Sequence, residues 1–145
     1  MKVLGLDGKL HNWNCKTKKR PKSSKLHLKA RDILKTIFPF ESIYEEVFLP
    51  GTVTLNHKGL RCDFYIPHQK LVVEVHGKQH FVFNSFHYAN KLHFGKAQTR
   101  DRDKEIWCNI NDIIYIGLPY NESEQQWVER IRTAHATDRT EMERT

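Results

Sequence analysis

The sequence predicts an α/β fold of the α+β kind, with a mixed four-stranded sheet flanked by helices. Short apolar runs that end in proline or Pro-Gly alternate with stretches whose apolar residues recur every three or four positions. The chain has 145 residues, of which 39% are hydrophobic and 28% charged, as is typical of a single folded domain. The predicted order is one helix, three strands, a second helix, a fourth strand and a last helix.

The first predicted helix spans 25–38, because apolar residues recur there at helical spacing and Pro39 follows. Ser23 or Ser24 is expected to cap its start. Three strands follow, and the third is apolar enough to be buried on both faces. They are expected at 41–49, 60–66 and 70–75, with His68 and Gln69 in the hairpin between the last two.

The second half of the chain begins with an aromatic, His-rich stretch at 81–94, which predicts a long loop or an irregular helix because it has no clear periodicity. A helix at 96–109, a strand at 113–118 and a helix at 122–134 are expected after it. The chain therefore divides into an arm with little regular structure at 1–23, a folded domain at 24–134 and a disordered tail at 135–145.

The charge is unevenly distributed along the chain. The formal net charge is +7, yet residues 1–31 carry ten Lys or Arg and one acid, a net of +9, whereas residues 32–145 carry fourteen against sixteen, a net of −2. A basic arm beside a nearly neutral body points to a polyanion such as nucleic acid, although a solubilising tail would have the same charge.

Several classes of protein are disfavoured by simple counts. No apolar run approaches 18 residues, so no membrane helix and no membrane partner are expected. Cys15, Cys62 and Cys108 are widely spaced and odd in number, which favours a reducing, cytoplasmic compartment over a disulfide framework. The small size and the basic arm suggest a phage-encoded protein, and the oligomeric state stays open.

Two acids lie inside the most apolar strands. Asp63 follows Cys62, and Glu74 follows Val73 on the next predicted strand. An ionised carboxylate in a buried strand is costly unless it is paired or binds a metal. On strands joined by a short hairpin, the two carboxylates can converge on one hard cation such as Mg²⁺, although surface pairing with Lys or Arg is the other interpretation. A metal so held neutralises charge and activates water for phosphodiester hydrolysis.

Polar residues follow Glu74 at once, in the run His76-Gly77-Lys78-Gln79-His80. Glu74 and His76 are two apart and share one face of a strand. Imidazole can take a proton from water near neutral pH, so this crowding favours a functional site over isolated structural histidines.

The runs Asp63–Pro67 and Leu71–Phe81 resemble the PD-(D/E)XK, or restriction-endonuclease-like, nucleases. They are most similar to the very-short-patch-repair (Vsr-like) branch and to homing endonucleases with an EDxHD signature. An Arg100-Asp101 helix before the last core strand is similar as well. The resemblance covers residues 24–120 and implies a restriction-endonuclease-like core in a nuclease-like domain.

The resemblance implies roles for individual residues. Asp63 would be the main metal ligand and Glu74 the second acid, with Mg²⁺, or Mn²⁺ in its place, as cofactor. His80 would be the histidine of EDxHD and Asp101 its final aspartate, while Gln79 would be a polar neighbour in the site.

Two positions depart from the family pattern. The residue two after the acid is usually Lys, but here it is His76, another candidate for the site. The first helix usually carries a Glu, and His27 stands at that position. The structural zinc of Vsr repair enzymes is not expected, because no Cys lies between Gly77 and Gly95.

A DNA partner would account for the basic arm, because Lys and Arg neutralise phosphates in a salt-dependent, sequence-independent way. Trp13 is expected either to stack on bases or to fold back on the core. The candidate DNA-binding residues are Trp13, Lys16, Lys18, Lys19, Arg20, Lys22, Lys25, Lys78, Arg100, Arg102 and Lys104.

The leading hypothesis is thus a metal-dependent DNA endonuclease of the Vsr-like nicking or homing type. A nuclease-fold protein that binds DNA without cutting it is the alternative, motivated by His27 and His76. A junction-resolving or structure-specific nuclease and an RNA substrate also stay open.

Overall fold

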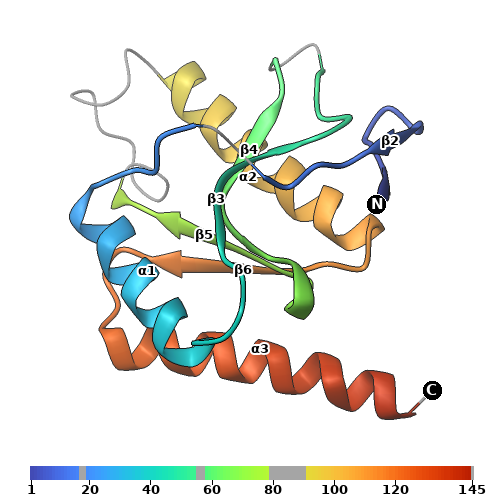
Figure 1. Ribbon diagram of the computed structural model, residues 1–145. Coiled ribbons are helices and arrows are strands. Elements are labelled where there is room, and N and C mark those ends of the chain that lie inside the picture. The colour runs from blue at the N-terminus through green and yellow to red at the C-terminus, as the bar shows by residue number, and fades with distance from the viewer. Residues whose placement is uncertain (17–18, 55–57, 79–90, 145) are drawn as a thin grey trace.

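The computed structural model describes residues 1–16, 19–54, 58–78 and 91–144, except for the side chains of 91–97 and 137–144. Its fold is α+β, with one four-stranded mixed sheet and three helices (Figure 1). The sheet consists of β3 (Tyr44–Leu49), β4 (Leu60–Ile66), β5 (Leu71–His76) and β6 (Ile114–Pro119). The helices are α1 (Lys25–Ile37), α2 (Lys91–Ile110) and α3 (Glu124–Arg144). The predicted order of helices and strands is confirmed from the first helix onward.

The strands lie in the order β3-β4-β5-β6, antiparallel except for the parallel pair β5 and β6. A short 3-10 turn at Pro67–Gln69 joins β4 to β5, and Lys70 adopts a left-handed φ of 48° to complete it. The parallel pair requires a crossover, which α2 provides on one face. Because β5 is central and parallel to β6, it is buried on both faces, as its apolar sequence predicts.

Two hydrophobic clusters cover the two faces of the sheet. One joins α1 and α3 to residues such as Phe64 and Val73. The other joins α2 and the N-terminal segment to residues such as Cys62 and Val72. The sheet is therefore the middle layer, and both sets of strand side chains are core (Figure 1).

The arm expected to lack regular structure begins instead with a small hairpin of β1 (Lys2–Leu4) and β2 (Leu10–Asn12). Val3 is buried in the second cluster, so the hairpin is part of the core. Three-residue strands are too short for their alternation to be recognised in the sequence. At the other end, α3 continues to Arg144, through residues expected to form a disordered tail.

The alternation of side chains in β3 and β4 changes phase at one point. Cys62 and Phe64 are two residues apart, yet they belong to clusters on opposite faces. The change falls at Asp63, and the register on either side places Glu46 of β3 opposite it. Glu46 has a φ of 53°, a left-handed conformation that is rare for a side chain with a Cβ. This local distortion positions the candidate site.

Candidate metal and phosphate site

Three buried carboxylates form a row across adjacent strands. Glu46 lies opposite Asp63, and continuing the β4–β5 register by one step pairs Asp63 with Glu74. Their exposed fractions are 4%, 6% and 3%. The next position across the sheet is Gly117, paired with Glu74. We call Glu46, Asp63 and Glu74 the carboxylate row. Such a concentration of buried negative charge requires cations or shared protons.

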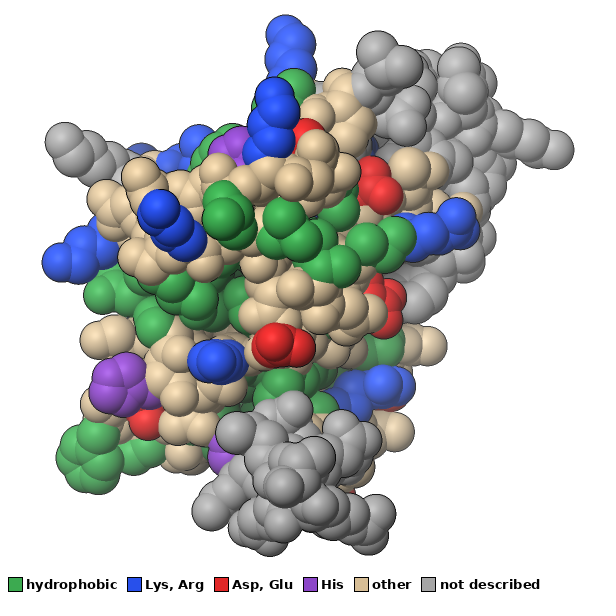
Figure 2. All heavy atoms as spheres, turned by 90° about the vertical axis from the view of Figure 1, so that its right-hand side faces the viewer, with side chains coloured by type: hydrophobic (Ala, Val, Ile, Leu, Met, Phe, Trp, Pro, Cys, Tyr) green, Lys and Arg blue, Asp and Glu red, His purple; other side chains and the backbone are tan. Residues whose placement is uncertain are grey.

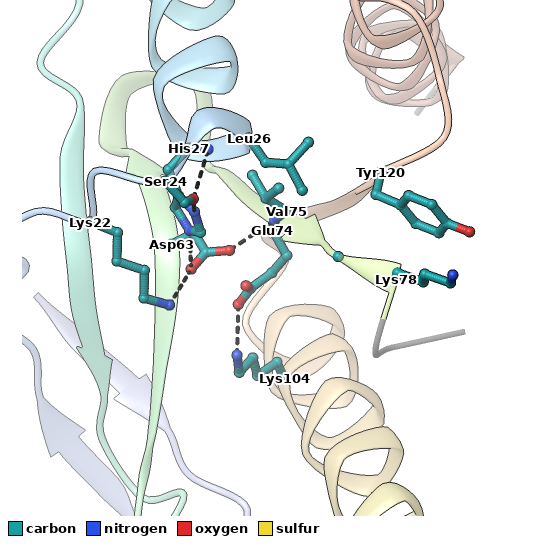
Figure 3. A pocket seen from close by; sticks show the side chains of 11 residues that line it. Lys22, Ser24, Leu26, His27, Asp63, Glu74, Val75, Lys78, Lys104 and Tyr120 are labelled. Carbon is teal, nitrogen blue, oxygen red and sulfur yellow. Dashed lines mark hydrogen bonds and ion pairs between the residues drawn. The ribbon is translucent and has the colours of Figure 1, made fainter. Parts of the chain in front are cut away.

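Two lysines approach the carboxylate row from different elements (Figure 3). Lys22, from the segment before α1, has its Nζ 3.2 Å from Asp63 Oδ1 and 3.3 Å from Glu46 Oε1. Lys104, from α2, has its Nζ 3.0 Å from Glu74 Oε1. The row is thus compensated at both ends by groups distant in the sequence.

The backbone around the row is held in place by further bonds. The Val75 N–H donates to Asp63 Oδ2 at 2.8 Å. The Asp63 carboxylate thus accepts the bond that a main-chain carbonyl of a neighbouring strand would otherwise accept from β5. Arg31 of α1 forms two 2.8 Å bonds with the Glu45 carboxylate and donates to the Lys22 carbonyl at 2.8 Å. Arg31 therefore fixes the residue next to Glu46 and the main chain that carries the Lys22 ammonium.

His27 reaches the row from the first turn of α1. The helix begins after Ser24, whose side chain accepts a bond from the His27 N–H, as the sequence predicts for its cap. The same Ser24 Oγ lies 2.7 Å from His27 Nδ1. His27 Nε2 lies 3.2 Å from Asp63 Oδ1.

Two buried polar atoms here make no hydrogen bond to any residue of the described part of the chain: His27 Nε2 and Glu74 Oε1. Each has a charged neighbour, Asp63 and Lys104 respectively, but the contact is not aligned as a hydrogen bond. Buried groups of this kind are unusual and indicate a site that can accept a ligand.

The paired carboxylates Asp63 and Glu74 divide their protons unequally. Burial alone raises the pKa of Asp63, but contacts from His27, Glu74, Lys22 and the Val75 N–H outweigh it and hold that pKa well below its usual range. Burial and the negative charge of Asp63 raise the pKa of Glu74 well above its usual range, although Lys104 opposes the shift. The two acids thus ionise in sequence, Asp63 first.

A cavity of about 410 Å³ opens beside these groups and is lined by residues of several elements. Asp63 and Glu74 form its acidic wall, and Lys78 and Tyr120 stand on the side away from Lys22 (Figure 3). Lys22 and Lys104 complete the lining near the acids. A cavity with acids at the back and lysines at the rim suits a phosphate group approached by a cation.

The predicted catalytic residues do not all meet here. Asp63 and Glu74 line the cavity, but His76 does not. The His76 ring lies over Gly117, where a Cβ would meet it at 2.8 Å, and its Nε2 is 3.2 Å from Tyr115 Oη. Asp101 lies on α2, near enough for its charge to act on Lys104 and Tyr115, but does not line the cavity.

Two predicted DNA contacts, Trp13 and Lys104, have largely buried side chains. Trp13 is 6% exposed, donates from Nε1 to the Phe48 carbonyl at 2.9 Å, and packs on Tyr65 and Trp107. Stacking on bases is thus wrong for Trp13, and folding back on the core is correct. The Lys104 side chain is 15% exposed and paired with Glu74, so it does not present a charge at the surface.

The remaining predicted site residues and DNA contacts divide into three groups. Lys22 faces the row, and Lys19 lies 3.9 Å from Glu46 Oε2. Gln79, His80 and Lys18 lie outside the described residues. Those exposed at the surface are Lys16, Arg20, Lys25, Lys78, Arg100 and Arg102.

Sequence reasoning missed Glu46 and the inward position of Lys22. Glu45 and Glu46 are neighbours in β3, so alternation places their side chains on opposite faces of the sheet. The change of phase at Glu46, whose φ is 53°, decides which of the two lies beside Asp63. His27 was singled out only by its place in the resemblance. Ser24 was expected as a cap, not as a partner of that imidazole.

The chain is similar to two viral proteins. It is 35% identical over 99 residues to uncharacterized protein 033L of Invertebrate iridescent virus 3, across 67% of this chain and 50% of that protein. It is 40% identical over 76 residues to uncharacterized protein 307L of Invertebrate iridescent virus 6, across 50% of this chain and 39% of that protein. The chain thus spans half or less of the length of these relatives.

No family model matches the sequence, and no solved structure matches the fold. No helix in the described part of the chain is both long and apolar enough to cross a bilayer.

Proposed function

We propose that this chain is a metal-dependent DNA endonuclease that hydrolyses phosphodiester bonds. The observation that carries the proposal is the pair Asp63 and Glu74, buried side by side on antiparallel strands at the wall of a lysine-rimmed cavity. Neighbouring buried carboxylates are costly, and binding of a divalent cation is an arrangement that accounts for them.

The order of elements agrees with a restriction-endonuclease-like core, which we propose for 24–134. One helix precedes three antiparallel strands, and a crossover helix leads to a fourth strand parallel to the third. The two acids fall on the second and third strands of this unit. This arrangement is the one that the resemblance to PD-(D/E)XK nucleases implies.

The residues present fit a divalent cation, because both acids offer oxygen donors and a lysine ammonium already lies against Asp63. Mg²⁺, or Mn²⁺ in its place, would neutralise phosphate charge and make water a better nucleophile there. Asp63 and Glu74 would hold the ion. Both carboxylates are buried, so the packing around them restricts the positions of their oxygens.

Lys104 supplies the positive charge that the family pattern expects at position 76. Its Nζ contacts Glu74 from α2, on the same face of β5 as His76, and its side chain is largely buried. Lys78 and Lys22 line the same cavity and are suited to hold phosphate oxygens. The exposed lysines and arginines before α1 would contact the flanking phosphates.

The basic residues that hold DNA are expected near this cavity. On the face drawn in Figure 2, Lys and Arg side chains stand apart from one another, separated by hydrophobic and other groups. A phosphate backbone needs several cations, and we expect them to be Lys16 and Arg20 of the segment before α1 and Lys25, the first residue of α1.

The test is cleavage of plasmid, nicked and branched DNA in the presence of Mg²⁺. Wild type should cut at least one of these, while Asp63→Asn and Glu74→Gln should lose about 100-fold or more of the rate. Glu129→Gln, an exposed change on α3, is the matched control and should cut like wild type. Full activity of both site variants would refute the proposal, and preference for branched DNA would indicate a junction-resolving enzyme.

The second candidate is a nuclease-fold protein that binds DNA without cutting it. It is favoured by two observations: the Lys22 ammonium already lies against Asp63 and Glu46, and His76 is engaged with Tyr115. Binding to DNA without turnover under Mg²⁺ or Mn²⁺ would select this candidate.

The relatives and the thiols support a proposal for the origin and the compartment. We propose that the chain is a protein of an invertebrate virus and not a phage protein, because both relatives come from viruses of invertebrates. A reducing compartment agrees with Cys15, Cys62 and Cys108, which are all free thiols.

A further inference from the structure

One end of the carboxylate row carries an imidazole. A nitrogen or oxygen from each of His27, Glu46 and Asp63 lies within 4.8 Å of the others, close to the ~3–4 Å spacing of ligands around one ion. Glu46 and Asp63 are buried and His27 is nearly so. Three donors from α1, β3 and β4 thus face one point.

A cation already lies at this point. The Lys22 ammonium is 3.2 Å from Asp63 and 3.3 Å from Glu46, in contact with two of the three donors. The Lys22 side chain is 52% exposed, so it can swing into solvent without disturbing the core. This position therefore favours a cation, and the Lys22 ammonium can leave it when another cation binds.

The third donor, His27 Nε2, is buried and makes no hydrogen bond to a described residue. Its other nitrogen, Nδ1, lies 2.7 Å from Ser24 Oγ. When Nδ1 carries the proton and donates it to Ser24, Nε2 presents a lone pair toward Asp63. A metal-binding histidine is commonly oriented in this way by a partner on its second nitrogen.

We propose that His27, Glu46 and Asp63 bind a first-row transition-metal ion, such as Mn²⁺, Co²⁺ or Zn²⁺, in preference to Mg²⁺, and that Lys22 yields its position to that ion. Mg²⁺ favours oxygen ligands, whereas an imidazole nitrogen stabilises transition ions. Glu74 does not belong to this position, because Lys104 compensates it on the far side of Asp63.

The site shares Asp63 with the proposed nuclease centre, but binding of an ion is measurable without any cleavage. A protein that binds Co²⁺ and does not cut DNA would leave this proposal standing and refute the nuclease. A protein that cuts DNA with Mg²⁺ but binds Co²⁺ and Mg²⁺ with equal affinity would refute this proposal and leave the nuclease standing.

The test is calorimetric titration of the full chain with Co²⁺ or Mg²⁺ as the only divalent ion. Wild type should bind Co²⁺ at least about tenfold more tightly than Mg²⁺. His27→Gln should lose roughly 10- to 100-fold of the Co²⁺ affinity and keep that for Mg²⁺. His68→Gln, at a histidine whose side chain is 87% exposed, is the matched control and should bind like wild type.

For Lys22→Met we expect the affinity for Co²⁺ to rise, whereas it falls in His27→Gln. Removing the competing ammonium should tighten Co²⁺ binding by about tenfold, a gain that misfolding cannot produce. Proton NMR of the wild-type Co²⁺ protein provides a second measurement, because a ligating imidazole shows strongly shifted ring resonances. Equal affinity for the two ions, unchanged Co²⁺ binding in folded His27→Gln, or no gain in Lys22→Met would each overturn the proposal.

Discussion

Lys104 Nζ lies 3.0 Å from Glu74 Oε1, and this contact joins the crossover helix α2 to the carboxylate row on the sheet. Lys104 is 28 positions from His76, the residue two after Glu74. Lys104 thus brings a positive charge to the face of β5 that carries Glu74, and α2 rather than β5 supplies it.

Lys104→Met should lower cleavage by about 100-fold or more, because it removes a fixed positive charge from a buried site. Lys35→Met, at an exposed lysine of α1 that is not among the candidate DNA contacts, should cut like wild type. The double variant Lys104→Met with His76→Lys returns a lysine to the same face and should recover part of the rate. Initial rates on plasmid DNA measure all three, and undiminished cleavage by Lys104→Met would remove the residue from the mechanism.

Changing Lys16, Arg20 and Lys25 together to Gln should make DNA binding less dependent on salt. Removing one protein–phosphate ion pair reduces the slope of log affinity against log salt by about 0.9. Fluorescence anisotropy at several salt concentrations measures the slope. The control changes three exposed cations elsewhere, Lys35, Lys58 and Arg132, and equal effects of the two sets would show that Lys16, Arg20 and Lys25 have no special role in DNA binding.

Trp13→Ala should destabilise the fold by roughly 3–5 kcal/mol, the usual cost of removing a buried aromatic side chain. Trp13→Phe should cost less, because it keeps the packing against Tyr65 and loses mainly the bond to the Phe48 carbonyl. Urea unfolding gives both values. A Trp13→Ala variant with native stability and weakened DNA binding would restore the stacking role that the buried position argues against.

Arg31→Gln should loosen the segment that carries Lys22. The change removes two charge-assisted bonds to Glu45 and the bond to the Lys22 carbonyl, so we expect the free energy of unfolding to fall by roughly 1.5–3 kcal/mol. Trypsin digestion followed by mass spectrometry should then show faster cleavage after Lys19 and Lys22 than in wild type. Arg132→Gln is the control on α3, and an identical digestion rate in Arg31→Gln would contradict the anchoring role.

The buried thiols should resist alkylation. Burial raises the pKa of Cys62 and of Cys108 far above the usual range, so neither forms a thiolate while the protein is folded, even at about pH 9. Cys15 is partly exposed and should react alone. Thiol titration should give one equivalent in the native state and three after denaturation, and rapid reaction of more than one native thiol would contradict the burial of the other two.

Local patterns predicted the three helices and the four strands of the main sheet, because each of these has a signal of its own in the sequence. The helix at Lys25–Ile37 and the strand at Leu60–Ile66 follow the predicted ranges closely. The two acids were recognisable because a charged residue is rare in an apolar strand. The sequence interpretation was wrong in expecting little regular structure at 1–23 and a disordered tail at 135–145. Neither the N-terminal hairpin nor the end of α3 has a strong periodic signal in the sequence.

The sequence by itself determined the order of elements, the pair Asp63 and Glu74, and the basic character of the first 31 residues. Only the tertiary structure decided which other charges meet that pair: Glu46, Lys22, His27 and Lys104 come from four different parts of the chain. These contacts depend on the change of phase opposite Asp63 and on how α1 and α2 pack against the two faces of the sheet. Such long-range geometry leaves no mark in local periodicity, because each residue taken alone has the pattern of an ordinary surface position.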